Sequence, residues 1–145
     1  MKEWILVTGG TGYIGSHTVV ELQQKGYEVI IIDNLSNSNV SVVNNIESIT
    51  GIRPSFEEID CCDKEALDAI FRKYINIKAI IHFAASKAVG ESVKKPLLYY
   101  RNNLVSLINL IGINVEIWSR NHLYFPHHVQ YMGNPMNYQS VRMLQ

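Results

Sequence analysis

The stretch WILVTGGTGYIGSHTVVEL, residues 4–22, decides the fold of this 145-residue chain. It begins with a short apolar run typical of a buried strand and continues into a helical pattern, with Gly9, Gly12 and Gly15 between the two. Glycines at this spacing let backbone N–H groups approach a diphosphate, and a helix beginning near Tyr13 would point its partly positive end at that charge. The same triplet also fits a tight turn that binds nothing and only allows the helix to pack closely on the strand.

The pattern of a short apolar run followed by an amphipathic stretch repeats along the chain. The predicted strands are residues 4–8, 27–33, 54–60 and 78–85, and the predicted helices are 13–26, 64–74 and 96–111. Residues 34–41 are interpreted as a polar loop. Because helices connect the strands, we expect an α/β fold with a doubly wound parallel sheet of the Rossmann type over residues 1–112.

Composition excludes several classes of partner. Thirteen Lys and Arg balance thirteen Asp and Glu, so nothing favours nucleic acid or an anionic membrane surface. No apolar run approaches the ~20 residues of a membrane span, and no signal-peptide pattern precedes the first strand. Cys61 and Cys62 are adjacent and predict free thiols. We therefore expect a cytoplasmic protein whose partner is a small molecule.

Asp33 ends the second apolar run, about 20 residues after the glycine turn. A carboxylate there can accept a hydrogen bond from the 2′-hydroxyl of an adenosine ribose, and it would repel a 2′-phosphate. The glycines and Asp33 together predict a dinucleotide site that prefers NAD to NADP. The alternative is that Asp33 only caps the loop that begins at Asn34.

Three segments show a closer resemblance: VTGGTGYIGSHT, DNLSNS and IHFAASKAVGESVKKPLLYYRNN. They resemble the N-terminal part of the UDP-glucose 4-epimerase family, which belongs to the extended short-chain dehydrogenases/reductases. The resemblance covers about residues 2–110. Where the family often has Gly-Leu, this chain has Ala85 and Ser86, a mild departure that leaves the cofactor interpretation intact.

The resemblance implies a set of NAD-binding residues. They are Gly9, Gly12, Tyr13, Ile14, Gly15, Asp33, Asn34, Asn37, Ser38, Asp60, Phe83, Ala84, Ala85, Lys87 and Asn102.

The resemblance also implies a reaction. Family enzymes are isomerases of galactose metabolism that interconvert UDP-glucose and UDP-galactose through a 4-keto sugar, and they use bound NAD to take up a hydride and return it. A Tyr in a Tyr-x-x-x-Lys pair removes a proton, and a Ser or Thr positions the substrate. Intact members are commonly homodimers. The partner implied is therefore a UDP-hexose.

The catalytic residues of the family are missing from this sequence. Tyr74 and Lys78 are the only Tyr and Lys at the required spacing, but they lie before the fourth strand, at the end of the sheet away from the cofactor. We assign no catalytic residue and expect no turnover by this chain. His82, inside AIIHFAA, is expected to be a strand-end histidine near the cofactor edge.

Residues 113–145 differ in character from the rest of the chain. Three of the four methionines and three of the five histidines lie beyond Trp118, and no acidic residue follows Glu116. We interpret this segment as a poorly ordered tail outside the family pattern, without helix or strand and without the family's fifth strand. His122, His127 and His128 lack a matching set of Cys or acidic ligands, so no metal site is expected.

One or more shifts of reading frame from Ile111 onward would account for the tail. With suitable codons for Tyr124 to Gly133, reading from the third base gives Phe-Ser-Ser-Ser-Cys-Thr-Val-Tyr-Gly, which resembles the missing family segment. Two other interpretations stay open for the chain as a whole. One is a non-catalytic NAD-binding module, and the other is part of a related sugar-nucleotide dehydratase or decarboxylase, which the segment KAVGESV disfavours.

Overall fold

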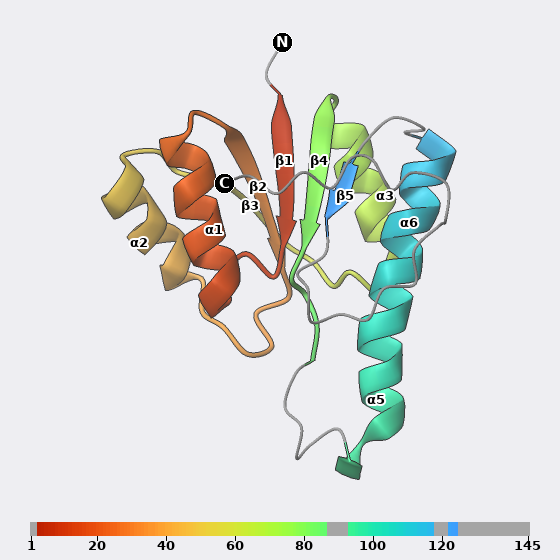
Figure 1. Cartoon of the computed structure of the whole chain (residues 1–145). Helices are drawn as coiled ribbons and strands as arrows, with labels where there is room; N and C mark the ends of the chain where they lie inside the picture. Colours follow the sequence, from red (N-terminus) through yellow and green to blue (C-terminus); the bar gives the residue numbers. More distant parts are fainter. Residues whose placement is uncertain (1–2, 87–92, 118–121, 125–145) are drawn as a thin grey trace.

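Five parallel strands form one sheet in the order β3-β2-β1-β4-β5, with helices on both faces (Figure 1). The computed structural model describes residues 3–86, 93–117 and 122–124, with side chains up to residue 113. The strands are β1 (Trp4–Thr8), β2 (Glu28–Asp33), β3 (Ser55–Glu58), β4 (Ile77–His82) and β5 (His122–Tyr124). The helices are α1 (Tyr13–Gln24), α2 (Ser41–Thr50), α3 (Lys64–Lys73), α5 (Pro96–Tyr100), the π-helical turn η1 (Arg101–Val105) and α6 (Ser106–Ile117).

Alternating side chains of the strands build two hydrophobic layers. Leu6 belongs to the layer under α3 and α6, whereas its neighbours Ile5 and Val7 belong to the layer under α1 and α2. Successive residues of a strand point to opposite faces, so a strand covered on both sides is apolar throughout. This explains the continuous apolar runs of the sequence, and the predicted doubly wound parallel α/β fold is confirmed.

The strand order also fixes the place of a ligand crevice. From β1 the chain first builds outward through β2 and β3, then returns to the other side of β1 with β4. Open α/β sheets bind ligands outside the carboxyl ends of the strands at such a reversal point. Here that point lies after Thr8 and His82, which are paired in register.

Helix α2 is a difference from the sequence analysis, which left residues 42–50 unassigned. Val43 and Ile46 are buried and three residues apart, and Gly51 ends the helix with a left-handed backbone at φ 73°. This is a helical apolar spacing followed by a glycine C-cap. The predicted loop therefore ends where α2 begins, at Ser41.

The structure also corrects the expectation that residues 113–145 contain no helix or strand. Helix α6 continues to Ile117 through Gly112, and β5 pairs in parallel with β4. A glycine inside a helix costs only about 1 kcal/mol, which the tertiary contacts of α6 can offset. A three-residue strand has no recognisable period of its own and is fixed by its partner strand. The expectations for residues 125–145 lie outside the described residues.

Candidate functional site

A cleft of about 320 Å³ lies at the carboxyl ends of the strands. Most residues of the predicted cofactor site line it. These thirteen are Gly9, Gly12, Tyr13, Ile14, Gly15, Asp33, Asn34, Asn37, Asp60, Phe83, Ala84, Ala85 and Asn102. Of the two others, Ser38 lies behind Asp33 and donates a hydrogen bond to it, and Lys87 lies outside the described residues.

The glycine turn forms one side of the cleft, and two of its positions tolerate no side chain. Gly9 has φ 67°, and a Cβ added there would lie 2.7 Å from the amide nitrogen of Ala84. A Cβ on Gly15 would collide with the carbonyl oxygen of Gly9. Glycine at these two positions therefore lets the turn pack closely against the segment after β4 and against the start of α1.

Helix α1 begins within the glycine turn, at Tyr13. Gly12 is its N-cap, with an extended backbone, and no side chain within the described part of the chain caps it. The first turn of α1 carries no acidic residue. The first amides of a helix have no intrahelical partner and favour an anion, so this end of α1 is suited to a phosphate group.

Asp33 stands across the turn at the end of β2 and is held by three donors. Its Oδ2 accepts from the amide of Thr11 at 3.2 Å. Its Oδ1 accepts from the amide of Leu35 at 3.0 Å and the hydroxyl of Ser38 at 3.2 Å. A carboxylate oxygen offers two lone pairs, so Oδ2 keeps one for a ligand hydroxyl. The carboxylate is thus oriented before any ligand arrives.

The opposite wall is the turn η1 with the segment that follows β4. Asn103 accepts from the amide of Ser86 at 2.7 Å and donates to the carbonyl of Ser86 at 3.1 Å. Asn102 donates to the Ser86 hydroxyl at 3.2 Å. Asparagine side chains thus hold the strand-end segment against the helix. A π-helical turn at such a place is a frequent feature of functional sites.

Two thiols belong to the same wall. Burial, followed by the nearby carboxylate of Asp60, raises the pKa of Cys61 to about 12. The same two causes raise the pKa of Cys62, whose Sγ lies 3.8 Å from the carbonyl oxygen of Arg101. Asn109 donates to the carbonyl oxygens of both cysteines at 3.1 and 3.0 Å. Both thiols therefore stay protonated near neutral pH and are poor nucleophiles.

Sequence reasoning did not predict six further residues of the cleft. They are Ser36, Ile59, Cys61, Cys62, Ser86 and Ser106. Most of them follow the ends of strands, at positions that no sequence motif marks. Ser106 begins α6, and its side chain is buried. Within the described ranges, no three metal-ligating side chains gather to hold an ion. None of the described helices is long and apolar enough to cross a membrane.

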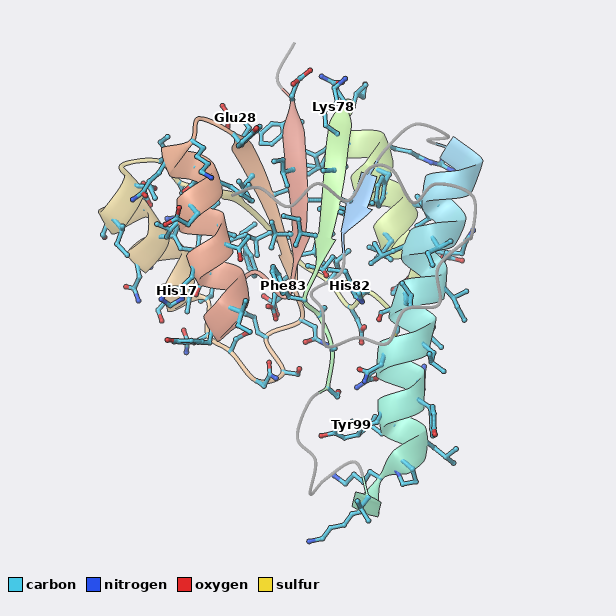
Figure 2. The ribbon with its side chains drawn as sticks, in the orientation of Figure 1. His17, Glu28, Lys78, His82, Phe83 and Tyr99 are labelled. Carbon is cyan, nitrogen blue, oxygen red and sulfur yellow. The ribbon has the colours of Figure 1, made fainter. Side chains whose placement is uncertain are left out.

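Tyr74 and Lys78 lie away from the cleft. The Tyr74 hydroxyl donates to Glu57 at 2.6 Å, and Lys78 pairs with Glu3 at 3.5 Å. Figure 2 shows Lys78 at the opposite end of β4 from His82 and Phe83. Neither residue lines the cleft.

Comparison with known proteins agrees with this geometry. A family model described as GDP-mannose 4,6 dehydratase matches residues 6–128. A UDP-glucose 4-epimerase of Schizosaccharomyces pombe is 57% identical over 107 residues, which are 74% of this chain and 30% of that protein. A UDP-glucose 4-epimerase of Bacillus subtilis is 57% identical over 100 residues, which are 69% of this chain and 29% of that protein.

Solved structures show the same similarity. The UDP-glucose 4-epimerase of Stenotrophomonas maltophila with bound NAD and formylated UDP-arabinopyranose matches with a TM-score of 0.80 and 46% identity, over 85% of this chain and 36% of that one. The Bifidobacterium longum enzyme in complex with NAD⁺ and UDP matches with a TM-score of 0.80 and 41% identity, over 84% of this chain and 36% of that one.

The chain thus spans about a third of the length of these relatives. It belongs to the family that the GDP-mannose 4,6 dehydratase model describes, and the relatives it resembles there are UDP-glucose 4-epimerases.

Proposed function

We propose that the cleft binds NAD. The observation that carries this proposal is the meeting of the closely packed glycine turn, the N-terminus of α1 and the oriented carboxylate of Asp33 around one cleft. The NAD-bound relatives support it. The carboxylate would repel a 2′-phosphate, so NAD is preferred to NADP.

Each part of the cleft suits a different part of the dinucleotide. The turn from Gly9 to Gly15 would hold the diphosphate, and Asp33 would accept from the adenosine ribose. The strand-end segment after β4 and the side chain of Asn102 then remain for the nicotinamide half. The fifteen residues named from the resemblance stay our proposed cofactor contacts.

We further propose that the chain represents the cofactor-binding part of a UDP-hexose 4-epimerase, with a UDP-hexose as the substrate of the longer protein. Bound NAD would supply a hydride acceptor for the sugar. The chain's own contribution is to bind and orient that cofactor. No Tyr and Lys at catalytic spacing lie near the cleft in the described residues, so this chain alone is proposed to bind NAD without turnover.

Titration calorimetry with NAD and with NADP tests the proposal on the full chain. We expect NAD to bind more tightly than NADP. Asp33→Asn should lower the affinity for NAD by about tenfold, because a hydrogen bond to a charged group contributes roughly 1.5–3 kcal/mol. The difference in affinity between NAD and NADP should therefore become smaller. Glu58→Gln, on the strand beside Asp33 but outside the cleft, is the matched control.

Two results would contradict the proposal. A folded wild-type chain that binds no NAD would refute the cofactor, and unchanged affinity in Asp33→Asn would refute the role of the carboxylate. An unchanged affinity in Glu58→Gln is expected, since its charge lies on an exposed strand end.

Intact family members are commonly homodimers. We therefore propose, second, that two copies of this chain associate through α5, η1 and α6. Leu97 and Ile108 are 82% and 64% exposed, and Leu104 lies between them at helical spacing. Light scattering should show a dimer that Ile108→Glu dissociates. Ile49→Glu on α2, at a site 63% exposed, should leave the assembly unchanged. A wild-type monomer would refute this proposal.

We also propose that the sequence beyond β5 is read in a shifted frame. The family match reaches residue 128 and β5 spans 122–124, and both observations support a change of frame near Tyr124 rather than at Ile111. Sequencing the transcript tests this. A frame that is intact as written, with no epimerase-like frame downstream, would refute it.

A further inference from the structure

A line of buried polar side chains crosses the base of the cleft. Thr8 ends β1, His82 ends β4 and Ser106 begins α6, and none of the three is more than 3% exposed. The Thr8 hydroxyl oxygen lies 2.7 Å from Nδ1 of His82, and Nε2 lies 3.5 Å from Oγ of Ser106, the longest link in the line. Figure 2 shows His82 beside Phe83 at the lower end of β4. A histidine thus bridges two strands and a helix.

The Ser106 end sets the direction of this line, because the hydroxyl of Ser106 has one hydrogen and donates it to the carbonyl of Asn102, so that towards Nε2 of His82 it accepts. The Thr8 hydroxyl accepts from the amide of Ala84 at 3.4 Å and is able to donate its own hydrogen to Nδ1 of His82. A neutral ring that accepts at Nδ1 carries its proton on Nε2, and it can donate from there to Ser106. The Ser106 hydroxyl in turn donates to the carbonyl of Asn102 at 2.5 Å.

The far end of the line is the wall of the cleft. Asn102 and Ser106 both line the cleft, and Asn102 also holds the hydroxyl of Ser86. The line therefore connects the ends of β1 and β4 with the π-helical turn. Aligned hydrogen bonds of this kind reinforce one another in a buried setting.

We infer that His82, held as the Nε2–H tautomer between Thr8 and Ser106, is a positioning residue that sets the π-helical wall of the cofactor cleft. The inference rests on the proposed binding of NAD. A histidine that only stabilised the sheet would lower the free energy of unfolding without altering the affinity of the folded chain for NAD. The two roles therefore predict different measurements.

The first measurement separates affinity from stability. Thr8→Val and Ser106→Ala each remove one end of the line and keep the side-chain volume nearly constant. Circular dichroism first shows that every variant is folded. We then expect each variant to bind NAD about tenfold more weakly, which is the effect of one buried hydrogen bond. The double variant should be weakened no further than either single variant, since breaking either end already frees the ring.

Thr50→Val is the matched control. Thr50 also donates a partly buried side-chain hydrogen bond, to Gln23 at 2.9 Å, but it lies outside the cleft. It should lower the melting temperature and leave the NAD affinity unchanged. Equal NAD affinity in wild type, Thr8→Val and Ser106→Ala would overturn the inference.

The second measurement needs no bound cofactor. In the full chain with ¹⁵N-labelled histidines, the resonances missing from His82→Gln identify the ring of His82. We expect an unprotonated Nδ1 and a protonated Nε2, and the opposite tautomer would overturn the inference. If wild type binds no NAD, the proposed function fails, while the ring resonances still decide the tautomer on which the inference depends.

Discussion

The two walls of the cleft are held in different ways. One wall, the glycine turn with the end of β2, is set by backbone geometry, because a Cβ on Gly15 would collide with Gly9 of the same turn and a Cβ on Gly9 would collide with Ala84 after β4. The other wall, η1 with the start of α6, is held by side-chain hydrogen bonds to segments 16 to 48 residues away. The backbone-built wall should therefore fail abruptly when mutated, and the side-chain-built wall gradually.

Two glycine substitutions break the first wall, and a third, at Gly26 away from the cleft, measures the backbone strain alone. Gly26→Ala adds only left-handed strain, since nothing lies within 4 Å of the new Cβ, and should cost about 1 kcal/mol. Gly15→Ala adds no left-handed strain, only the clash with the backbone of Gly9 and Gly10, and should cost about 2 kcal/mol. Gly9→Ala combines strain and clash and should cost about 4 kcal/mol.

Urea unfolding of the three variants tests this order of stability, and titration calorimetry measures their binding of NAD. We expect Gly9→Ala and Gly15→Ala to lose NAD binding, whereas Gly26→Ala, remote from the cleft, keeps it. Equal stability of Gly9→Ala and Gly26→Ala would show that the turn can move away from Ala84 and is not rigid.

The second wall is tested most directly at Asn103. Asn103→Ala removes both hydrogen bonds to the Ser86 backbone and should cost about 1–2 kcal/mol, since a typical buried hydrogen bond contributes roughly 1 kcal/mol. NAD affinity should fall several-fold, because the strand-end segment is loosened but not displaced. Asn44→Ala on α2 removes an exposed hydrogen bond from Arg53 and is the control. A complete loss of NAD binding in Asn103→Ala would make the two walls alike.

The same difference explains what the sequence could predict. Gly9 and Asp33 are readable because a backbone constraint and a strand end each restrict the residue type at a fixed spacing. The roles of Asn103, Asn109 and Ser106 depend on which distant segments meet, and no local pattern encodes that. One signal was present in the sequence, since asparagine is a poor former of helices and yet recurs in the predicted helix.

The helices and strands also differ in how well the sequence predicts them. Strands β1 and β2 were found because burial on both faces makes them almost continuously apolar, whereas β3, at the edge of the sheet, is only partly buried and has a weaker pattern. β5 is short and defined by its pairing with β4, so it has no periodic pattern of its own that could predict it. Helix α2 could have been predicted from the spacing of Val43 and Ile46 with Gly51 as its C-cap.

The smallest effect is expected at Cys62, where the second wall can be probed without disturbing the fold. Burial, then the carboxylate of Asp60, raises the pKa of this thiol, so little thiolate is present near neutral pH and alkylation by iodoacetamide should be slow. The rate should increase as the pH rises toward that raised pKa. Bound NAD should slow it further, because Cys62 lines the cleft. Mass spectrometry of the intact chain measures the labelling.

Cys61 provides the internal control for this measurement. It is 6% exposed with a pKa raised to about 12, so it should remain unlabelled until the chain unfolds. Cys62→Ser, which leaves Cys61 as the only thiol, should therefore resist labelling in the folded state. Rapid labelling of Cys61 in that variant would mean that α6 separates from residues 60–62 in solution. The hydrogen bonds of Asn109 would then be too weak to hold the second wall, and NAD would have to order this wall when it binds.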